Sequence, residues 1–247
     1  FTRSGTVDTY LNTLYGHILA GGKVETWPTV RDHIDRSVAY MLSVGEDRIP
    51  GELGWFGIWP KGKNTDGLQL DEVEYLMCKS LAHDAPISLE TSFGQMDSHP
   101  LTSGILEIVR AYEELRIGRK VAEAARPRLR EKGKDFILRQ RRGPVGGRLS
   151  YEFIEVAAAP VVAGGREVRA FVGKHGDGSI ATLWHAAGKE GKLLLATDAG
   201  ALHAMDLDGK PLVVGKEQGS ALVPFGPRRT TLFLRGLMPD AARDLLF

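Results

Sequence analysis

The chain has 247 residues, 43% of them hydrophobic, and its 32 basic and 31 acidic residues leave a formal net charge of +1. This composition predicts one large or two modest globular domains and gives no overall reason to expect a nucleic acid or an anionic membrane as partner. The single cysteine, Cys78, excludes an intramolecular disulfide, and we expect it to be a small buried side chain in a helix.

Hydropathy and the first residue give expectations about membrane association and about processing of the chain. No stretch reaches the roughly 20 apolar residues of a membrane-spanning helix, so no membrane partner is expected. The sequence starts with Phe1 rather than methionine. We therefore expect the chain to be a processed product or a piece of a longer protein.

Two helices are predicted before residue 45. Apolar residues recur at three-and-four spacing over 7–19 and again over 30–42, with the first pattern ended by two glycines. Pro28 precedes the second pattern, as is typical of a first helical turn.

A strand, a helix and a second strand follow. Apolar runs at 53–59 and 87–90 predict the strands, and 71–81 predicts an amphipathic helix that opens with two acidic residues. This order and spacing imply a crossover between parallel strands. Sites of open α/β sheets and barrels lie at the carboxyl ends of such strands, which is where Glu90, Thr91 and Ser92 fall.

The middle of the chain is predicted to be a polar loop at 94–100, a helix at 101–115 and a charged segment from 116 to 134 that continues as a helix and a connection. The charged segment and the residues after it are rich in arginine and lysine. They lack interleaved aromatic residues and are offset by acidic ones, so we favour a solvated helical face over a nucleic-acid patch.

From about Gly143 short alternating segments separated by glycine-rich turns predict an antiparallel sandwich. The strands are expected at 151–156, 168–172, 180–184, 192–196, 201–206, 211–214, 220–223 and 230–234. The predicted fold class is α/β plus all-β. Residues 1–118 form an α/β barrel portion, 119–142 a charged helical connection and 143–247 a β-sandwich accessory domain.

The order of these pieces resembles the C-terminal portion of a glycoside hydrolase, in which the last units of a (β/α)8 barrel precede a β-sandwich. The resemblance rests on residues 53–58, 71–75, 85–92 and 112–116, and in the sandwich on 181–185, 188–191 and 206–210. A complete barrel takes about 250 residues. Either the N-terminal half of the barrel therefore lies outside this chain, or the α/β part is a smaller layered domain.

Glycoside hydrolysis requires two carboxyl groups, one protonated and one ionised. Glu90 is the first candidate, because it directly follows an apolar run. It could equally fix a loop or bind a sugar hydroxyl without doing chemistry. Glu52 is the second candidate, although it precedes its strand and so falls at the amino end.

Five further residues are candidates for substrate binding. Trp55 and Trp59 are four apart and would face the same side of a strand, where an indole can stack on a sugar ring or pack in the core. Lys61, Asp97 and His99 are expected on loops after the strands, where side chains reach a ligand or remain solvated.

Several other chemistries are disfavoured. The remaining histidines form no zinc or iron pattern, and no dinucleotide, P-loop or serine-hydrolase glycine motif is present. We expect neither a metal nor a cofactor.

The leading hypothesis is a glycoside hydrolase acting on a polysaccharide or oligosaccharide. The alternative is a non-catalytic carbohydrate-binding or scaffold protein, and a third class is a basic nucleic-acid adaptor using 116–142. The expected partner is a carbohydrate, with the missing N-terminal part of the same protein as a further candidate. One cysteine fits a cytosolic protein, yet many polysaccharide-degrading enzymes are exported, so the compartment stays open with a slight preference for secretion or the periplasm.

Overall fold

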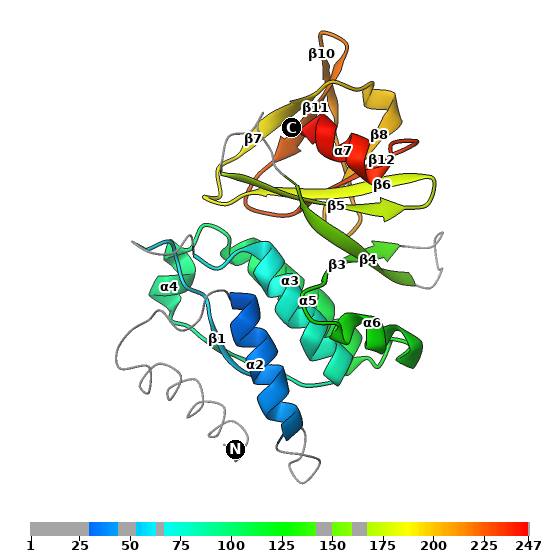
Figure 1. Cartoon of the computed structure of the whole chain (residues 1–247). Coiled ribbons are helices and arrows are strands. Elements are labelled where there is room, and N and C mark those ends of the chain that lie inside the picture. Colours follow the sequence, from blue (N-terminus) through cyan, green and yellow to red (C-terminus); the bar gives the residue numbers. More distant parts are fainter. Residues whose placement is uncertain (1–29, 44–52, 63–66, 142–149, 160–166, 247) are drawn as a thin grey trace. The chain divides into compact units, whose positions relative to one another are not determined.

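A computed structural model describes residues 30–43, 53–62, 67–141, 150–159 and 167–246 (Figure 1). The chain forms two compact units. The N-terminal unit contains the described residues up to His99 together with Val109–Gly133, and the C-terminal unit contains Pro100–Ile108 and the described residues from Lys134 onward. The helix 7–19 predicted from the sequence lies outside the described residues.

The N-terminal unit begins with α2 (Val30–Ser43), β1 (Gly54–Gly57), α3 (Leu70–His83) and β2 (Ile87–Glu90). β1 and β2 pair in parallel, so this prediction is confirmed. A small apolar cluster joins the elements and consists of Ile34, Leu53, Phe56, Tyr75, Leu76 and Ala85.

Helix α3 is the centre of this unit. Eleven of its 14 residues are buried, Cys78 among them, so the helix is enclosed on more than the single face that its amphipathic pattern predicted. It starts with a reciprocal capping box between Gln69 and Glu72, and Asp71 adds a negative charge at the positive end of the helix dipole. It ends at Asp84, whose left-handed backbone (φ 52°) lets its N–H reach the carbonyls of Leu81 and Ser80.

The prediction of a loop at 94–100 is wrong, because the short helix α4 (Phe93–Ser98) lies there. Ser92 caps it: its hydroxyl accepts a hydrogen bond from the Gln95 N–H at 3.2 Å, and its own N–H donates to Gln95 Oε1 at 2.9 Å. This serine and glutamine, three residues apart, form a capping box that offsets the poor helix propensity of Gly94.

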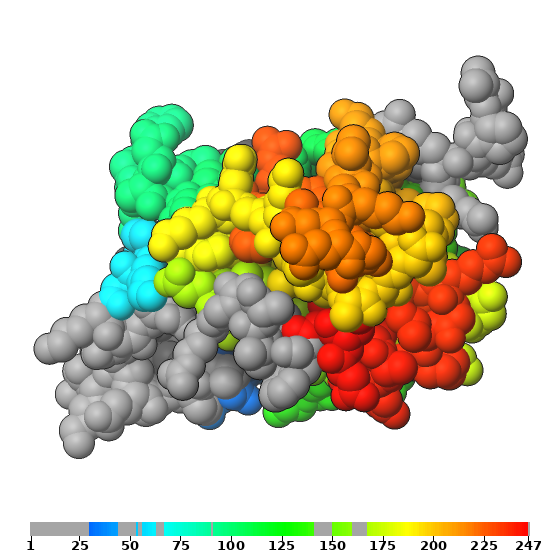
Figure 2. Space-filling model, turned by 90° about the horizontal axis from the view of Figure 1, so that it is seen from above, coloured from blue at the N-terminus to red at the C-terminus, as the bar shows by residue number. Residues whose placement is uncertain are grey.

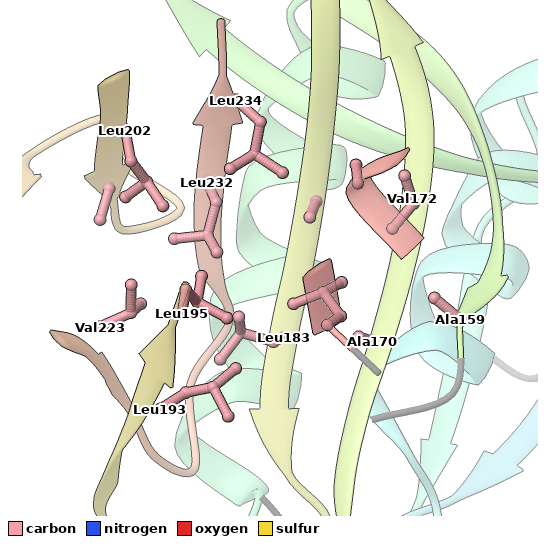
Figure 3. Packing of buried hydrophobic residues seen from close by; sticks show 14 of the residues in the cluster. Ala159, Ala170, Val172, Leu183, Leu193, Leu195, Leu202, Val223, Leu232 and Leu234 are labelled. Atoms are coloured by element: carbon pink, nitrogen blue, oxygen red, sulfur yellow. The ribbon is translucent and has the colours of Figure 1, made fainter. Parts of the chain in front are cut away.

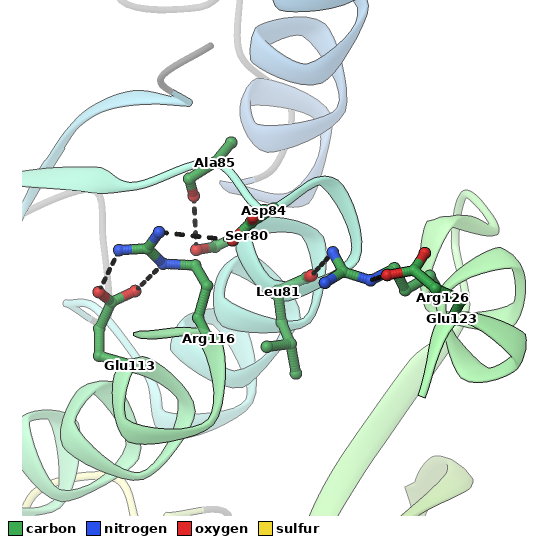
Figure 4. A network of polar contacts seen from close by, with 8 residues as sticks. All are labelled: Ser80, Leu81, Asp84, Ala85, Glu113, Arg116, Glu123 and Arg126. Carbon is green, nitrogen blue, oxygen red and sulfur yellow. Dashed lines mark hydrogen bonds and ion pairs between the residues drawn. The ribbon is translucent and has the colours of Figure 1, made fainter. Parts of the chain in front are cut away.

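After α5 (Thr102–Ile117), the charged segment forms a 3-10 turn (Glu123–Ala125) and the short helix α6 (Arg126–Arg130). Some of its arginines form hydrogen bonds within the protein and do not only cover a solvated helical face. Arg126 donates to the carbonyl of Leu81 at 2.9 Å (Figure 4). Arg130 donates to the carbonyl of Ala82 at 3.1 Å, so both arginines cap the end of α3.

Arg116 anchors the same region from α5. Two of its nitrogens donate to the carboxylate of Glu113 at 2.8 and 2.7 Å, and a third lies 3.6 Å from Asp84 (Figure 4). The hydrogen bonds to Glu113 are the main cause that raises the pKa of Arg116. The basic residues therefore hold the ends of helices.

The C-terminal unit is an antiparallel β structure, as predicted. Seven strands form one curled sheet in the order β3-β4-β5-β6-β12-β8-β9, and three form a smaller sheet in the order β10-β11-β7 (Figure 1). The strands are β3 (Asp135–Arg141), β4 (Ser150–Ala159), β5 (Val168–His175), β6 (Gly178–His185), β7 (Gly191–Leu195), β8 (Leu202–Met205), β9 (Pro211–Leu212), β10 (Gly215–Glu217), β11 (Ser220–Phe225) and β12 (Thr230–Leu234).

The curl of the larger sheet is centred on β4. The first part of this strand pairs with β3 and its last three residues pair with β5. Gly173 of β5 makes the close approach possible, because a Cβ there would lie 2.2 Å from the carbonyl oxygen of Glu155.

One aliphatic core fills the space between the two sheets (Figure 3). Inward residues of β5, β6, β8 and β12 meet those of β7 and β11, and Ala242 and Leu246 of α7 (Pro239–Leu246) close it. On one face of the molecule β7 and the β10–β11 hairpin lie at the surface next to each other (Figure 2, yellow and orange).

The sequence did not predict β3, β10 or α7. β3 lies at the end of the charged segment 119–142, where its arginines concealed the alternation of a strand. The protein is thus a mixed helix and strand structure with a curled antiparallel half-barrel sheet. Within the described ranges the parallel pairing consists of β1 and β2, so the eight-stranded barrel is not seen there.

Candidate functional site

The candidate site lies at the carboxyl end of the parallel pair β1–β2. In the register of the pair Gly57 faces Glu90, the last residue of β2, and Trp55 faces Ser88. The backbones after Gly57 and after Glu90 therefore leave the sheet at the same edge.

Trp59 is held at this edge by contact with a glycine. A Cβ added to Gly57 would lie 2.0 Å from both Cε2 and Nε1 of the Trp59 indole, so the ring lies directly against the Gly57 backbone. The side chain is nevertheless 48% exposed. One part of the indole is thus fixed by the protein and another part is open to solvent.

The loop after Trp59 is tight. The Leu68 N–H donates to the Trp59 carbonyl at 3.0 Å, and Gly67 adopts a left-handed backbone with φ 80°. A side chain at Gly67 would lie 2.8 Å from the backbone nitrogen of Lys61, so glycine is required for both conformation and space. Lys61 itself is exposed on this loop.

His99 connects α4 to the same loop. It is the C-cap residue of α4, and its side chain is only 4% exposed. Burial is the largest cause that lowers the pKa of His99, whereas hydrogen bonds to the backbone carbonyls of Leu68 and Trp59 act in the opposite direction. Burial thus favours the uncharged form of this imidazole beside the backbone of Trp59 and Leu68.

The remaining predicted residues are distributed as follows. Asp97 is exposed on α4 rather than on a loop, and His99 is a buried cap rather than a solvated loop residue, because the capping box at Ser92 forms a helix there. Glu52 lies outside the described residues, and Glu90 and Trp55 are described by their backbone. The backbone therefore places Glu90 opposite Gly57, and Trp59 and Lys61 follow on the loop after Gly57.

Sequence reasoning missed two residues at this edge. Gly57 could have been noticed because a glycine inside a strand pattern often marks a close approach. Phe93 is 86% exposed at the start of α4, and the Ser92–Gln95 capping box was the signal that a helix begins there.

Among the described residues no group of three or more His, Cys, Asp or Glu side chains could hold a metal ion. None of the described helices is long and apolar enough to span a bilayer.

No family model matches this sequence, and no curated protein matches it. Solved structures with partial similarity exist. A family 39 glycoside hydrolase from the gut symbiont Bacteroides cellulosilyticus WH2 has a TM-score of 0.28 at 12% identity over 80% of this chain and 38% of its own. AmyP in complex with maltose has a TM-score of 0.33 at 11% identity, over 85% of this chain and 49% of its own.

A noncanonic maltogenic alpha-amylase, AmyB from Thermotoga neapolitana, has a TM-score of 0.28 at 12% identity, over 92% of this chain and 50% of its own. The chain thus spans half or less of the length of these three structures. At these scores the similarity identifies no family and no activity for this chain.

Proposed function

We propose that this protein is carbohydrate-active and acts as a glycoside hydrolase on a polysaccharide or oligosaccharide. The observation that carries the proposal is the parallel register of β1 and β2. It sets Glu90 opposite Gly57, the residue against which the exposed Trp59 indole lies. A sugar-cleaving site combines these residue types, since an aromatic ring binds the apolar face of the sugar, a carboxylic acid protonates the leaving oxygen and a carboxylate attacks the sugar or activates water.

In this proposal Glu90 is one of the two carboxyl groups, serving as acid or as nucleophile, and Glu52 is the candidate for the other. Trp59 binds a sugar ring, and Trp55, Lys61, Asp97 and His99 complete the proposed site. Lys61 and Asp97 are exposed and can donate to and accept from sugar hydroxyls.

The proposal includes the larger fold. β1, α3 and β2 act as one strand–helix–strand portion of a (β/α) barrel within residues 1–118. The predicted connection 119–142 serves as one only up to Gly133, because β3 belongs to the larger sheet, and the C-terminal unit acts as the accessory domain predicted at 143–247.

The second candidate is a non-catalytic carbohydrate-binding protein. The fixed indole of Trp59 favours it, because stacking on a sugar requires a positioned ring and no pair of carboxylates.

Glu90→Gln separates the two candidates. For the hydrolase we expect cleavage of malto-, cello- or xylo-oligosaccharides to be abolished while calorimetric binding of the same sugars persists. Glu114→Gln, an exposed carboxylate on α5, is the matched control and should retain full cleavage. If the unaltered chain binds but cleaves none of these sugars, the binding protein is the better description.

Gly57→Ala tests the Trp59 platform. The added Cβ would meet the indole at 2.0 Å and move it, so sugar binding should fall and the near-ultraviolet circular dichroism should change. Gly94→Ala is the control, since a Cβ there meets nothing within 4 Å. Unchanged binding in Gly57→Ala would remove Trp59 from the proposed site.

A further inference from the structure

Phe93 has no packing role that would account for an aromatic residue. It is 86% exposed, and it occupies the first position of α4, directly after the capping residue Ser92. Water in contact with so large an apolar surface costs free energy, which makes an exposed large aromatic more informative than an exposed small residue.

Helix α4 connects Phe93 to the proposed sugar site. Its C-cap is His99, whose pKa responds to the backbone of Leu68 and Trp59, and Phe93 begins its opposite end. The six residues of α4 measure about 9 Å along the helix axis. In Figure 2 the segment after β1 (cyan) and the α4 segment (spring green) lie next to each other on one face. Trp59 and Phe93 therefore lie on two neighbouring segments, residues 58–62 and α4, which together we call the strip.

The strip also carries exposed polar side chains. Asp97 and Ser98 are exposed on α4, and Lys61 is exposed on the loop beyond Trp59. A protein partner would be expected to cover a continuous apolar patch with few charges at its centre. Separate aromatic rings with hydrogen-bonding side chains near them fit a chain of sugar rings, which alternates apolar faces with hydroxyl groups.

We propose that Phe93 is a second stacking platform, and that this edge binds several consecutive units of an oligosaccharide rather than one terminal sugar. This inference rests on the proposed function. In this arrangement Trp59 binds one sugar ring and Phe93 binds another ring further along the glycan. The polar side chains of α4 bind hydroxyl groups of the glycan. The substrate class is accordingly a linear glycan of at least three units.

The test is calorimetric titration of the full chain with malto-, cello- and xylo-oligosaccharides of two to six units. For the series that binds, affinity should rise with length. Phe93→Ala should weaken binding of the long sugars by about two- to tenfold and leave the disaccharide unchanged, as expected for one stacking contact. Phe93→Tyr should restore the long-sugar affinity, and Trp59→Ala should weaken every length.

Ile117→Ala is the matched control, because this side chain is 72% exposed on α5 and is distant in sequence from the strip. It should bind all lengths normally. If Phe93→Ala binds long sugars as well as the unaltered chain while Trp59→Ala does not, the inference is overturned and the proposed function stands. If the unaltered chain binds no member of the three series, the proposed function fails and the inference fails with it.

Discussion

Two charged side chains of α3 are buried and hydrogen-bonded in the N-terminal unit, whereas the cluster between the two sheets of the C-terminal unit is aliphatic. The C-terminal unit buries hydrogen-bonded polar residues outside that cluster, such as Arg229, which donates to the Leu138 carbonyl. Glu74 and Lys79 of α3 are 3% and 1% exposed. Glu74 accepts a hydrogen bond from the Tyr112 hydroxyl at 3.1 Å, and Lys79 donates to the carbonyls of Leu129 and Glu131 at 3.0 and 2.5 Å. The corresponding core of the C-terminal unit consists of valine, leucine and alanine (Figure 3).

The difference teaches how each unit is specified. A buried polar group requires a partner at one position and in one direction, so α3 is held to α5 and α6 by particular bonds. An aliphatic core requires that volume be filled, so many side chains share the task. We therefore expect the stability of the α3 region to fall when a hydrogen-bond partner is removed. The stability of the C-terminal unit should fall when volume is removed from its aliphatic cluster.

The largest effect is expected from a cavity in the C-terminal core. Leu232 is 0% exposed, and Leu232→Ala should lower the free energy of unfolding by about 4 kcal/mol, through lost transfer energy and the cavity left behind. Urea unfolding followed by hydrogen exchange of β12 and β6 peptides would measure it. Val213→Ala, at an 87% exposed site, should change stability by less than about 0.5 kcal/mol. An equally small cost for Leu232→Ala would contradict the volume argument.

The next effect concerns the polar interior. Lys79→Met keeps the aliphatic stem but leaves the carbonyls of Leu129 and Glu131 without their lysine donor, and should cost about 3 kcal/mol. It should also increase hydrogen exchange in α6. Lys120→Met, at an exposed position, is the control. If Lys79→Met is neutral, the polar bonds do not hold α6 and the contrast between the units disappears.

A pH effect should come from His83. Burial lowers its pKa to about 4, and the positive charges of Arg130, Lys79 and Arg126 add to this. Arg126 and Arg130 also cap the carbonyls of Leu81 and Ala82, so they outweigh the attraction that a helix C-terminus has for a protonated histidine.

Between pH 6.5 and about 4 the unfolded chain binds a proton at His83 that the folded chain does not. The contribution of His83 to the free energy of unfolding is therefore fully present above pH 6.5. It falls by about 2 kcal/mol as the pH is lowered toward 4, a value reduced because the side chain is partly exposed. His83→Gln should flatten the pH dependence of the urea midpoint in this window. His203→Gln, at an exposed position, should leave it unchanged, and an identical slope in both variants would refute the assignment.

The smallest effect is expected at α4. Ser92→Ala removes the hydroxyl that accepts from Gln95 and should cost about 1 kcal/mol, confined to this helix. Hydrogen exchange of the α4 peptide should increase, and long-sugar binding should weaken with it because Phe93 stands on this helix. Ser92→Asp should preserve the cap. Exchange that stays as slow in Ser92→Ala as in the unaltered chain would show that His99 alone holds the helix.

The sequence was sufficient to predict elements whose pattern is clear over a few neighbouring residues. The apolar runs at 53–59 and 87–90 and the acidic start of the intervening helix predicted the parallel pair correctly. The alternating segments after residue 150 predicted an antiparallel structure. For the proposed site, the sequence named the carboxyl edge of the strands and Trp59 as candidates, whereas Gly57 and Phe93 entered only with the structure.

The sequence failed to predict α4 and β3 for a common reason. α4 depends on a reciprocal cap that is only a few residues long, and β3 is rich in arginines whose partners are elsewhere in the chain. Arg139 of β3, for example, lies 3.2 Å from Glu152 and stacks over the ring of Phe233, with 4.6 Å between the guanidinium carbon and the ring centre. Such contacts are absent from a window of neighbouring residues.

The sequence by itself therefore determined the helices and strands with a clear periodicity and the parallel pairing of β1 and β2, because periodicity acts over a few residues. Only the tertiary structure decided that a lysine and a glutamate are interior residues of α3. It alone also decided that arginines end that helix and that an indole lies on Gly57. Each of these depends on partners brought together by folding, since burial of a charge or a close ring contact is stable only when the complementary group is present.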